Sequence, residues 1–293
     1  MGLVIKQIEW LVGQIREHKI HGSVLQIGRI DFFISVESFQ DMLCELGVAK
    51  RIVHNGVKEI QFADDLLHKK YLDLLASGEQ VNKVFNNPRF TKKSPLISDK
   101  LFFLSMGFDE CTSIDLDTSR DHADVQFDLN KRGLLSTVKH QFDLVIDCGT
   151  MEHIFDVRQV MENITGATKT DGAIIHITPG NNTFDHGFFQ FSPTLFSDYY
   201  SCNSYDILDL SVFELGRNCY SLPDAPFDER WDTSRFFKYD PWLMAKCSFG
   251  KLAADRIYFT HCCVRKTKLS LENRVPIQYL FTPGAKYISP WKE

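Results

Sequence analysis

The chain has 293 residues, of which 44% are hydrophobic and 24% charged, and its formal net charge is −5. These values are ordinary for a globular protein and exclude a disordered chain, a collagen-like repeat and a disulfide-stapled scaffold. The negative charge argues against a nucleic-acid partner held by bulk electrostatics. No apolar run reaches the length that spans a bilayer, so we expect no membrane partner.

The start of the chain and its cysteines both favour a cytoplasmic protein. Lys6 and Glu9 interrupt the first apolar stretch, which a secretory signal peptide would keep intact. The 8 cysteines are scattered and form no C-x-x-C pair, and a chain of this size needs no disulfide staple. We therefore expect reduced, buried thiols.

The first segment, residues 1–22, is expected to form one amphipathic helix. Its apolar residues recur at helical spacing from Ile5 to Ile15, and Gly22 is placed to end it as a left-handed cap. Residues 23–28 then form a short apolar run that leads into a glycine turn. This run predicts the first strand of a sheet.

The rest of the chain alternates between predicted strands and helices. Residues 30–98 contain two helix-like stretches, near 36–47 and 63–76, and are interpreted as a helical insertion after the first strand. Further strands are expected at 110–116, 123–127, 142–148, 172–178, 205–214 and 257–264, and further helices at 99–106, 154–169 and 192–202.

This alternation is typical of an α/β fold. We expect a Rossmann-like, doubly wound, mostly parallel sheet of seven strands with helices on both faces. Residues 23–293 are then one domain that follows the N-terminal helix.

Polar residues follow the predicted strands, at the edge where doubly wound sheets bind their ligands. Because the carboxyl ends of parallel strands meet at one edge, we expect these side chains to gather there. The residues concerned are Gln26, Gly28, Asp115, Asp117, Asp128, Asp147, Cys148, Gly149, Glu152, His153, Asn181 and Asn182.

Their order along the chain resembles the class I S-adenosylmethionine-dependent methyltransferases over roughly residues 22–215. The resemblance implies S-adenosyl-L-methionine as the cofactor and S-adenosyl-L-homocysteine as the product. It implies that Asp115, or Asp117 if the strand ends later, holds the ribose hydroxyls. By the same resemblance, Asp128 accepts from the adenine amine, and residues 147–150 line the methyl-transfer pocket.

The loop after the first strand departs from the family's pattern of an acid and several glycines. It reads Gln26-Ile27-Gly28-Arg29-Ile30-Asp31 and keeps one glycine. Gln26 retains hydrogen-bonding groups for the cofactor or for the loop, and Asp31 is the candidate for the missing charge. Gly28 either admits the cofactor or is a plain structural turn.

Several of the other candidates also have an ordinary structural interpretation. Asp128 suits the cap of a following turn, and Glu152 suits the positive end of a helix dipole. His153 suits a satisfied structural histidine.

Two histidines are candidates for the catalytic base. His186 follows the fifth predicted strand, after Asn181 and Asn182, and His153 follows the fourth. Histidine is the side chain whose ordinary titration range lies near neutral pH, so either imidazole suits proton transfer. Glu152 and the two asparagines are candidate substrate residues. A turn histidine that hydrogen-bonds to backbone is the alternative for His186.

The stretch 216–250 alternates aromatic and charged residues. Trp231 in this stretch is a candidate contact for the acceptor. A homodimer interface explains the same composition equally well, because aromatic residues and arginine are enriched at interfaces. The histidines and cysteines show no spacing typical of a metal site, so we expect no metal.

The resemblance implies a methyltransferase that uses S-adenosylmethionine, and we expect a small-molecule or saccharide-like acceptor. A histidine base slightly favours O-methylation, and the insertion is interpreted as a cap over the acceptor. The alternative is a catalytically silent, methyltransferase-like binding or scaffold protein, which the eroded glycine loop favours. The chain has neither a complete G-x-G-x-x-G nor a P-loop, which argues against a reductase or another nucleotide-using enzyme.

Overall fold

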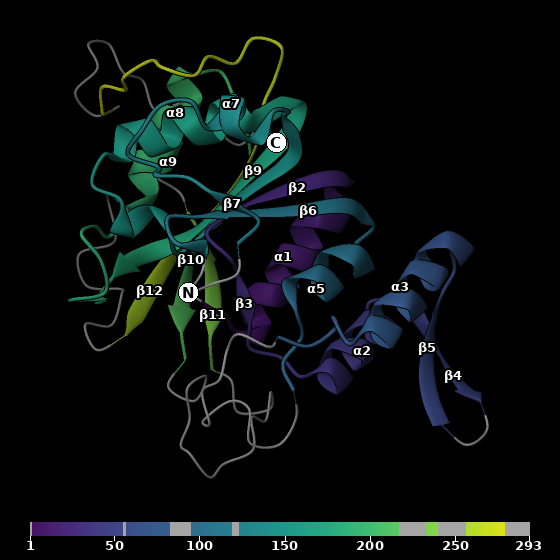
Figure 1. Ribbon diagram of the computed structural model, residues 1–293. Coiled ribbons are helices and arrows are strands. Elements are labelled where there is room, and N and C mark those ends of the chain that lie inside the picture. Colours follow the sequence, from purple (N-terminus) through teal and green to yellow (C-terminus); the bar gives the residue numbers. More distant parts are fainter. Residues whose placement is uncertain are drawn as a thin grey trace.

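The computed structural model describes residues 2–54, 57–82, 95–118, 123–216, 233–239 and 256–278. Its centre is a sheet with helices on either side (Figure 1). The strands are β1 (Gly2–Leu3), β2 (Gly22–Ile27), β3 (Asp31–Phe32), β4 (Ala49–His54), β5 (Val57–Phe62), β6 (Phe108–Asp115), β7 (Val125–Gln126), β8 (Phe142–Cys148), β9 (Thr168–Asn181), β10 (Asp206–Leu215), β11 (Arg235–Lys238) and β12 (Ile257–Arg265). The helices are α1 (Ile5–Glu17), α2 (Val36–Glu45), α3 (Asp65–Ser77), α5 (Asp99–Ser105), α7 (Leu134–Val138), α8 (Val157–Ala167), α9 (Pro193–Cys202) and the short 3-10 helix η1 (Met151–His153).

The central sheet has the strand order β11-β10-β12-β9-β8-β2-β6-β7. Strands β2, β6, β7, β8 and β9 run parallel, whereas β12, β10 and β11 add antiparallel pairs at one side. Strands β6 and β7 follow β2 in the chain and lie on one side of it, whereas the next strand, β8, lies on the other side of β2. The strand order therefore reverses between β2 and β8, which is where doubly wound sheets bind ligands.

The expected doubly wound, mostly parallel α/β sheet is confirmed. The sheet has 8 strands in the part of the chain that the structure describes, whereas seven were expected. The additional strand is β11, which lies in the aromatic stretch that was not predicted to contain one. Within the described ranges, no helix is both long enough and apolar enough to cross a membrane.

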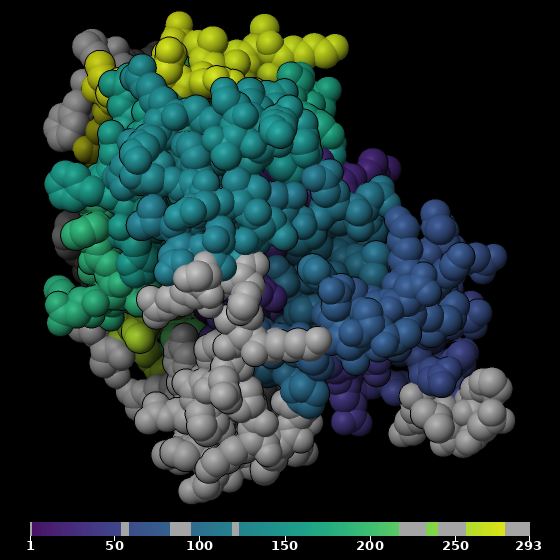
Figure 2. Space-filling model, viewed as in Figure 1, coloured from purple at the N-terminus to yellow at the C-terminus, as the bar shows by residue number. Residues whose placement is uncertain are grey.

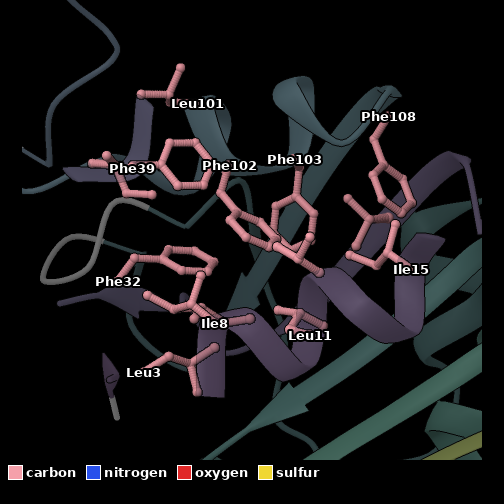
Figure 3. Close-up of a cluster of buried hydrophobic side chains, with 14 of the residues drawn as sticks. Leu3, Ile8, Leu11, Ile15, Phe32, Phe39, Leu101, Phe102, Phe103 and Phe108 are labelled. Carbon is pink, nitrogen blue, oxygen red and sulfur yellow. The ribbon is translucent and has the colours of Figure 1, made fainter. Parts of the chain in front are cut away.

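Helices α1 and α5 cover one face of the sheet with an aromatic-rich layer (Figure 3). The ring of Phe32 stacks on that of Phe102 with centroids 4.4 Å apart, and Phe103 meets Phe108 edge-on at 5.6 Å. Leu11 of α1 packs into the same cluster. The N-terminal helix therefore shares its core with the sheet.

Helices α7, α8 and α9 cover the opposite face. Ile27 of β2 and Val145 of β8 are fully buried there, against Ile164 of α8 and Tyr200 of α9. Complete burial of an aliphatic or aromatic side chain of this size contributes about 1.5–3 kcal/mol. Because both layers bury residues of β2 and β8, the two strands at the reversal in strand order are held firmly.

Residues 36–77 form a lobe beside the main body (Figures 1 and 2). Its two expected helices are confirmed as α2 and α3, and an unexpected antiparallel hairpin, β4–β5, lies between them. Strand β5 shows the alternation typical of a half-buried strand, with Ile60 and Phe62 buried and Glu59 and Gln61 exposed. A closing movement of this lobe over an acceptor stays a prediction.

The sequence predicted that Gly22 caps the first helix, and this prediction is wrong. Helix α1 ends at Glu17, and the left-handed residue after it is Lys19, with φ 52°. Gly22 instead opens β2 with φ 101°, and a Cβ there would lie 2.4 Å from the Asp143 carboxylate. The glycine is thus required where β2 passes β8 and not where the helix stops.

Candidate active site

The loops after β2, β6 and β8 lie at one edge of the sheet. Ile27, the last residue of β2, is paired with Ile114 of β6 on one side and with Asp147 of β8 on the other. The backbone N–H of Gly28 donates to the carbonyl of Ile114 at 2.9 Å. The candidate residues that follow these three strands are therefore neighbours, as the predicted strand order requires.

Asp147 is fully buried and is hydrogen-bonded on both carboxylate oxygens. Its Oδ1 accepts the backbone N–H groups of Thr150 at 3.2 Å and Met151 at 3.1 Å. Its Oδ2 lies 3.2 Å from Nδ1 of His176, whose Nε2 lies 2.6 Å from the Tyr200 hydroxyl. Asp147 therefore fixes the turn after β8 through these hydrogen bonds, and its carboxylate does not face solvent.

Cys148 and Gly149 continue this turn. The Cys148 side chain is 1% exposed, and burial raises the pKa of its thiol, so the thiolate is disfavoured. Gly149 has φ 74°, in the left-handed region that glycine adopts without strain. These two residues form the bend that brings η1 to the edge of the sheet.

Glu152, His153 and His186 come together beyond β8. The Glu152 side chain is 0% exposed, and its Oε1 lies 3.3 Å from Nε2 of His186 and 3.8 Å from Nε2 of His153. The two imidazole centroids are 5.1 Å apart, and both rings are partly exposed to solvent. His153 and His186, the two predicted catalytic histidines, thus both face the carboxylate of Glu152, which was predicted to contact the substrate.

The loop that carries His186 is fixed to Glu152 through backbone. The N–H groups of Phe188 and Phe189 donate to the Glu152 carbonyl at 2.8 and 3.2 Å. A Cβ on Gly187 would lie 2.8 Å from that carbonyl oxygen and 2.9 Å from Cγ of Glu152. Gly187 is therefore the residue that permits this close approach, and it places His186 against the carboxylate.

Aromatic side chains stand exposed beside this group. Phe155 is 73%, Phe188 is 67% and Phe184 is 83% exposed. The rings of Phe155 and Phe188 meet edge to face, with centroids 5.8 Å apart. Exposed apolar side chains that cluster in this way mark interaction surfaces more often than scattered ones do. We name Phe155 and Phe188 the aromatic surface.

Buried hydrogen bonds of Gln26 and an ion pair between Arg29 and Asp99 fix the loop after β2. The Gln26 side chain is fully buried; its Nε2 donates to Asp99 Oδ2 at 2.9 Å, and its Oε1 accepts from the Ile30 N–H at 3.1 Å. The guanidinium of Arg29 lies 3.2 Å from the other Asp99 oxygen. Gln26 thus contacts the loop, which was one of its two predicted roles. Asp99 was not singled out from the sequence.

Gly28 is needed for a close contact within the protein. Its φ is 73°, and a Cβ there would lie 2.1 Å from Oγ1 of Thr150. The tight turn thus lets the loop after β2 pass the loop after β8. This contact supports the structural interpretation of the glycine, and contact with a cofactor stays a prediction.

Three of the predicted cofactor-binding acids, Asp115, Asp117 and Asp128, lie at or just after the ends of β6 and β7. Asp115 ends β6, is half-buried and accepts the backbone N–H of the exposed Asp117 at 3.2 Å. Asp128 Oδ1 accepts both the backbone N–H and the side-chain amide of Asn130, each at 3.0 Å. These bonds hold the pKa of Asp128 below its usual range. They also fit the alternative role of Asp128 as a local cap.

The remaining predicted substrate residues are farther along the chain. Asn181 ends β9 and is exposed. The side-chain amide of Asn182 donates to the backbone carbonyl of Arg256 at 2.6 Å, which ties this turn to the segment before β12. Trp231 lies outside the described residues.

Sequence reasoning missed the partners of the predicted residues. His176 stands in a continuously apolar run, Ile174-Ile175-His176-Ile177, and a lone histidine inside such a strand signals a buried partner. The partner is Asp147 on the neighbouring strand, a pairing that depends on strand register.

No family model matches the chain, and no curated protein matches it. Solved structures do resemble it. The O-methyltransferase of a trans-AT polyketide synthase multienzyme of Brevibacillus brevis, in complex with S-adenosyl-L-homocysteine, is 9% identical over 89% of this chain and 73% of its own, with a TM-score of 0.41. The StiE O-methyltransferase is 13% identical over 91% of this chain and 75% of its own, with a TM-score of 0.35.

A third structure is the 1,6-didemethyltoxoflavin N1-methyltransferase of Burkholderia thailandensis, in complex with its substrate and S-adenosylhomocysteine. It is 12% identical over 70% of this chain and 80% of its own, with a TM-score of 0.33. All three of these structures are methyltransferases.

Proposed function

We propose that this protein is an S-adenosylmethionine-dependent methyltransferase that methylates an acceptor hydroxyl beside His186. The observation that carries the proposal is the buried Glu152 carboxylate, 3.3 Å from Nε2 of His186, on the turn that follows β8. This turn lies next to the reversal in strand order, where a doubly wound sheet holds its ligand. A carboxylate behind an imidazole is an arrangement suited to proton transfer.

The cofactor would lie across the ends of β2 and β6. The half-buried Asp115 carboxylate uses one oxygen for one local hydrogen bond, so it retains acceptor capacity for the two ribose hydroxyls. Asp128 is the candidate acceptor for the adenine amine, with the rest of its carboxylate bonded to Asn130. The bound cofactor would supply an activated methyl group on a sulfonium leaving group.

The residues of this chain would then position the acceptor and remove its proton. The carboxylate of Glu152 favours a proton on the His186 Nε2 that faces it, which leaves the Nδ1 lone pair for the acceptor hydroxyl. The imidazole of His186 would take up the proton of the acceptor hydroxyl at Nδ1. The buried negative charge of Glu152 stabilises the imidazolium that forms. His153, whose Nε2 faces the same Oε1 atom, is the second candidate for this role.

The aromatic surface suggests how the acceptor is held. Phe155 and Phe188 present exposed rings close to the histidines, and flat rings stack favourably on such faces. We propose a small-molecule or saccharide-like acceptor with a flat face and a hydroxyl group. Its ring would rest on these phenylalanines and its hydroxyl would point to His186.

The test is methyl transfer by the purified chain. The protein is incubated with isotopically labelled S-adenosylmethionine and matched panels of phenols, saccharides and amines, and products are detected by mass spectrometry. Enzyme-dependent label on a hydroxylated acceptor, together with S-adenosylhomocysteine, supports the proposal. Cofactor binding with no labelled product in any panel would instead support a catalytically silent binding protein.

That second candidate function has its own observation in favour. Arg29 and Gln26 are both bonded to Asp99, so the loop after β2 is closed by side chains in place of several glycines. A loop closed in this way suits a domain that binds a partner without turnover. The panel experiment separates the two functions because only the enzyme releases S-adenosylhomocysteine.

A further inference from the structure

The Glu152 carboxylate is buried and has no hydrogen-bond partner among the residues that the structure describes. Its side chain is 0% exposed, and neither Oε1 nor Oε2 accepts a hydrogen bond from any described residue. A buried ionised carboxylate is strongly disfavoured unless positive charge or donors meet it. The site therefore calls for a cationic group on the side that faces the two histidines.

Two imidazoles supply nitrogen donors on that side. One ligand atom from each of Glu152, His153 and His186 can be chosen so that all three lie within 4.8 Å of one another. Both histidines are partly exposed, so a small rotation of their rings is unhindered by a packed core. The hydrogen bonds from the Phe188 and Phe189 N–H groups to the Glu152 carbonyl hold the loop of His186 against Glu152 without any ligand.

We infer that Glu152, His153 and His186 form a binding site for one divalent transition-metal ion of the zinc type. Two bonds of 2.0–2.1 Å at a tetrahedral angle place the ligand atoms about 3.3 Å apart. The Oε1 of Glu152 lies 3.3 Å from one imidazole nitrogen and 3.8 Å from the other, so only a small inward shift is needed. Two histidines and one carboxylate also leave a coordination position open.

The donor set selects the class of ion. Imidazole nitrogen suits zinc, cobalt and other transition metals, whereas magnesium and calcium prefer oxygen ligands. The sequence did not signal this site, because His153 in η1 and His186 in the loop after β9 are far apart in the chain and show no metal-site spacing. The fold brings them together around one carboxylate.

The site does not depend on the proposed reaction, because its occupancy is measured without cofactor or acceptor. Metal binding and the proposed proton transfer cannot both use Nε2 of His186 at the same time. A bound ion takes the Nε2 lone pair of His186, where the pair with Glu152 in the proposed reaction needs an N–H group.

The experiment uses the full-length protein after treatment with a chelator. Co²⁺ is titrated while the visible absorption of the protein-bound ion is recorded, and Zn²⁺ is titrated by calorimetry. The site variants are Glu152→Gln, His153→Ala and His186→Ala. The control is His140→Ala, which removes the imidazole of an exposed pair of the same residue types, with Glu110 Oε1 3.1 Å from His140 Nε2.

The wild type is expected to bind one ion per chain with an absorption spectrum of low coordination number. Each site variant should weaken binding by about tenfold or more, and His140→Ala should leave it unchanged. Circular dichroism and thermal unfolding confirm that each variant is folded.

Two results would overturn the inference. One is a wild type that shows no saturable Co²⁺ or Zn²⁺ binding up to millimolar metal. The other is a folded Glu152→Gln variant that binds as tightly as the wild type, which would place the ion elsewhere. Neither the Co²⁺ absorption nor the Zn²⁺ calorimetry depends on methyl transfer, so a failure of the proposed reaction would not change them.

Discussion

Asp147 of β8 and His176 of β9 form a fully buried pair, with Oδ2 3.2 Å from Nδ1. The pair joins the two strands beneath the candidate active site, and the other Asp147 oxygen holds the N–H groups of Thr150 and Met151. The turn that carries Glu152 therefore depends on an ionisable pair that never contacts solvent. This buried pair connects the core of the sheet with the geometry of the site.

Asp147→Asn tests this connection. An asparagine oxygen can still accept from the turn, but its amide places a donor toward His176 and loses the charge. We expect the free energy of unfolding to fall by about 1–3 kcal/mol, the cost of a poorly satisfied buried group. Denaturant unfolding measures the change. A variant as stable as the wild type would show that the pair contributes little to the fold.

A double-mutant cycle tests the contact between Gly28 and Thr150. Gly28→Ala adds a Cβ 2.1 Å from Oγ1 of Thr150 at a φ of 73°, so both a clash and backbone strain are expected. The strain alone costs about 1–2 kcal/mol. In the background of Thr150→Ala, which lacks Oγ1, the same change should cost less. Equal costs in both backgrounds, measured by chemical denaturation, would show that the clash relaxes elsewhere.

His261 predicts a dependence of stability on pH. The side chain lies among the rings of Trp10, Phe213 and Phe236, and burial lowers its pKa from the ordinary 6.5 to about 3. The folded state therefore keeps it neutral, while the unfolded state takes up a proton below pH 6.5. Its contribution to stability is complete above pH 6.5 and is lost as the pH falls toward 3, by up to about 1.4 kcal/mol per pH unit.

His261→Phe is the matched variant for this effect. Its stability should fall less steeply than that of the wild type between pH 6.5 and 3, as measured by denaturant unfolding across that range. His21→Gln, at an exposed histidine, is the control and should follow the wild type. Parallel curves for wild type and His261→Phe would contradict the burial of a neutral imidazole.

His186→Ala tests the proton acceptor of the proposed reaction. Removal of a general base lowers turnover by roughly 10²–10⁴, and affinity for the cofactor should stay unchanged because the imidazole acts on the acceptor. Steady-state kinetics and calorimetry separate these two quantities. A variant that loses cofactor binding and turnover together would assign His186 a structural role. His140→Ala is the surface control.

The elements that were predictable share a strong local pattern. The strand Phe142–Cys148 was placed with its observed bounds because a short, almost continuous apolar run is typical of a strand buried on both faces. The hairpin β4–β5 and the short β11 were missed because strands that are half exposed carry a weaker signal. The position of Gly22 shows a second limit, since the glycine is required by its contact with Asp143 on another strand.

The candidate site was predictable to the level of the sheet edge. Parallel strands share that edge, so the chain order alone placed Glu152 and His153 near the loop after β2. Glu152 is buried, and its Oε1 faces both histidines. This arrangement depends on the direction of the side chains on η1 and on the close approach that Gly187 permits. Neither can be read from the chain order.

The most direct test of the proposed function is calorimetric titration of the purified chain with S-adenosylmethionine and S-adenosylhomocysteine. We predict micromolar binding of at least one of them. Asp115→Ala should weaken it by about 1.5–3 kcal/mol, the range for hydrogen bonds to a charged group. Asp109→Ala, at the other end of β6, should bind as the wild type does. A folded protein that binds neither compound at millimolar concentration would contradict the proposed function.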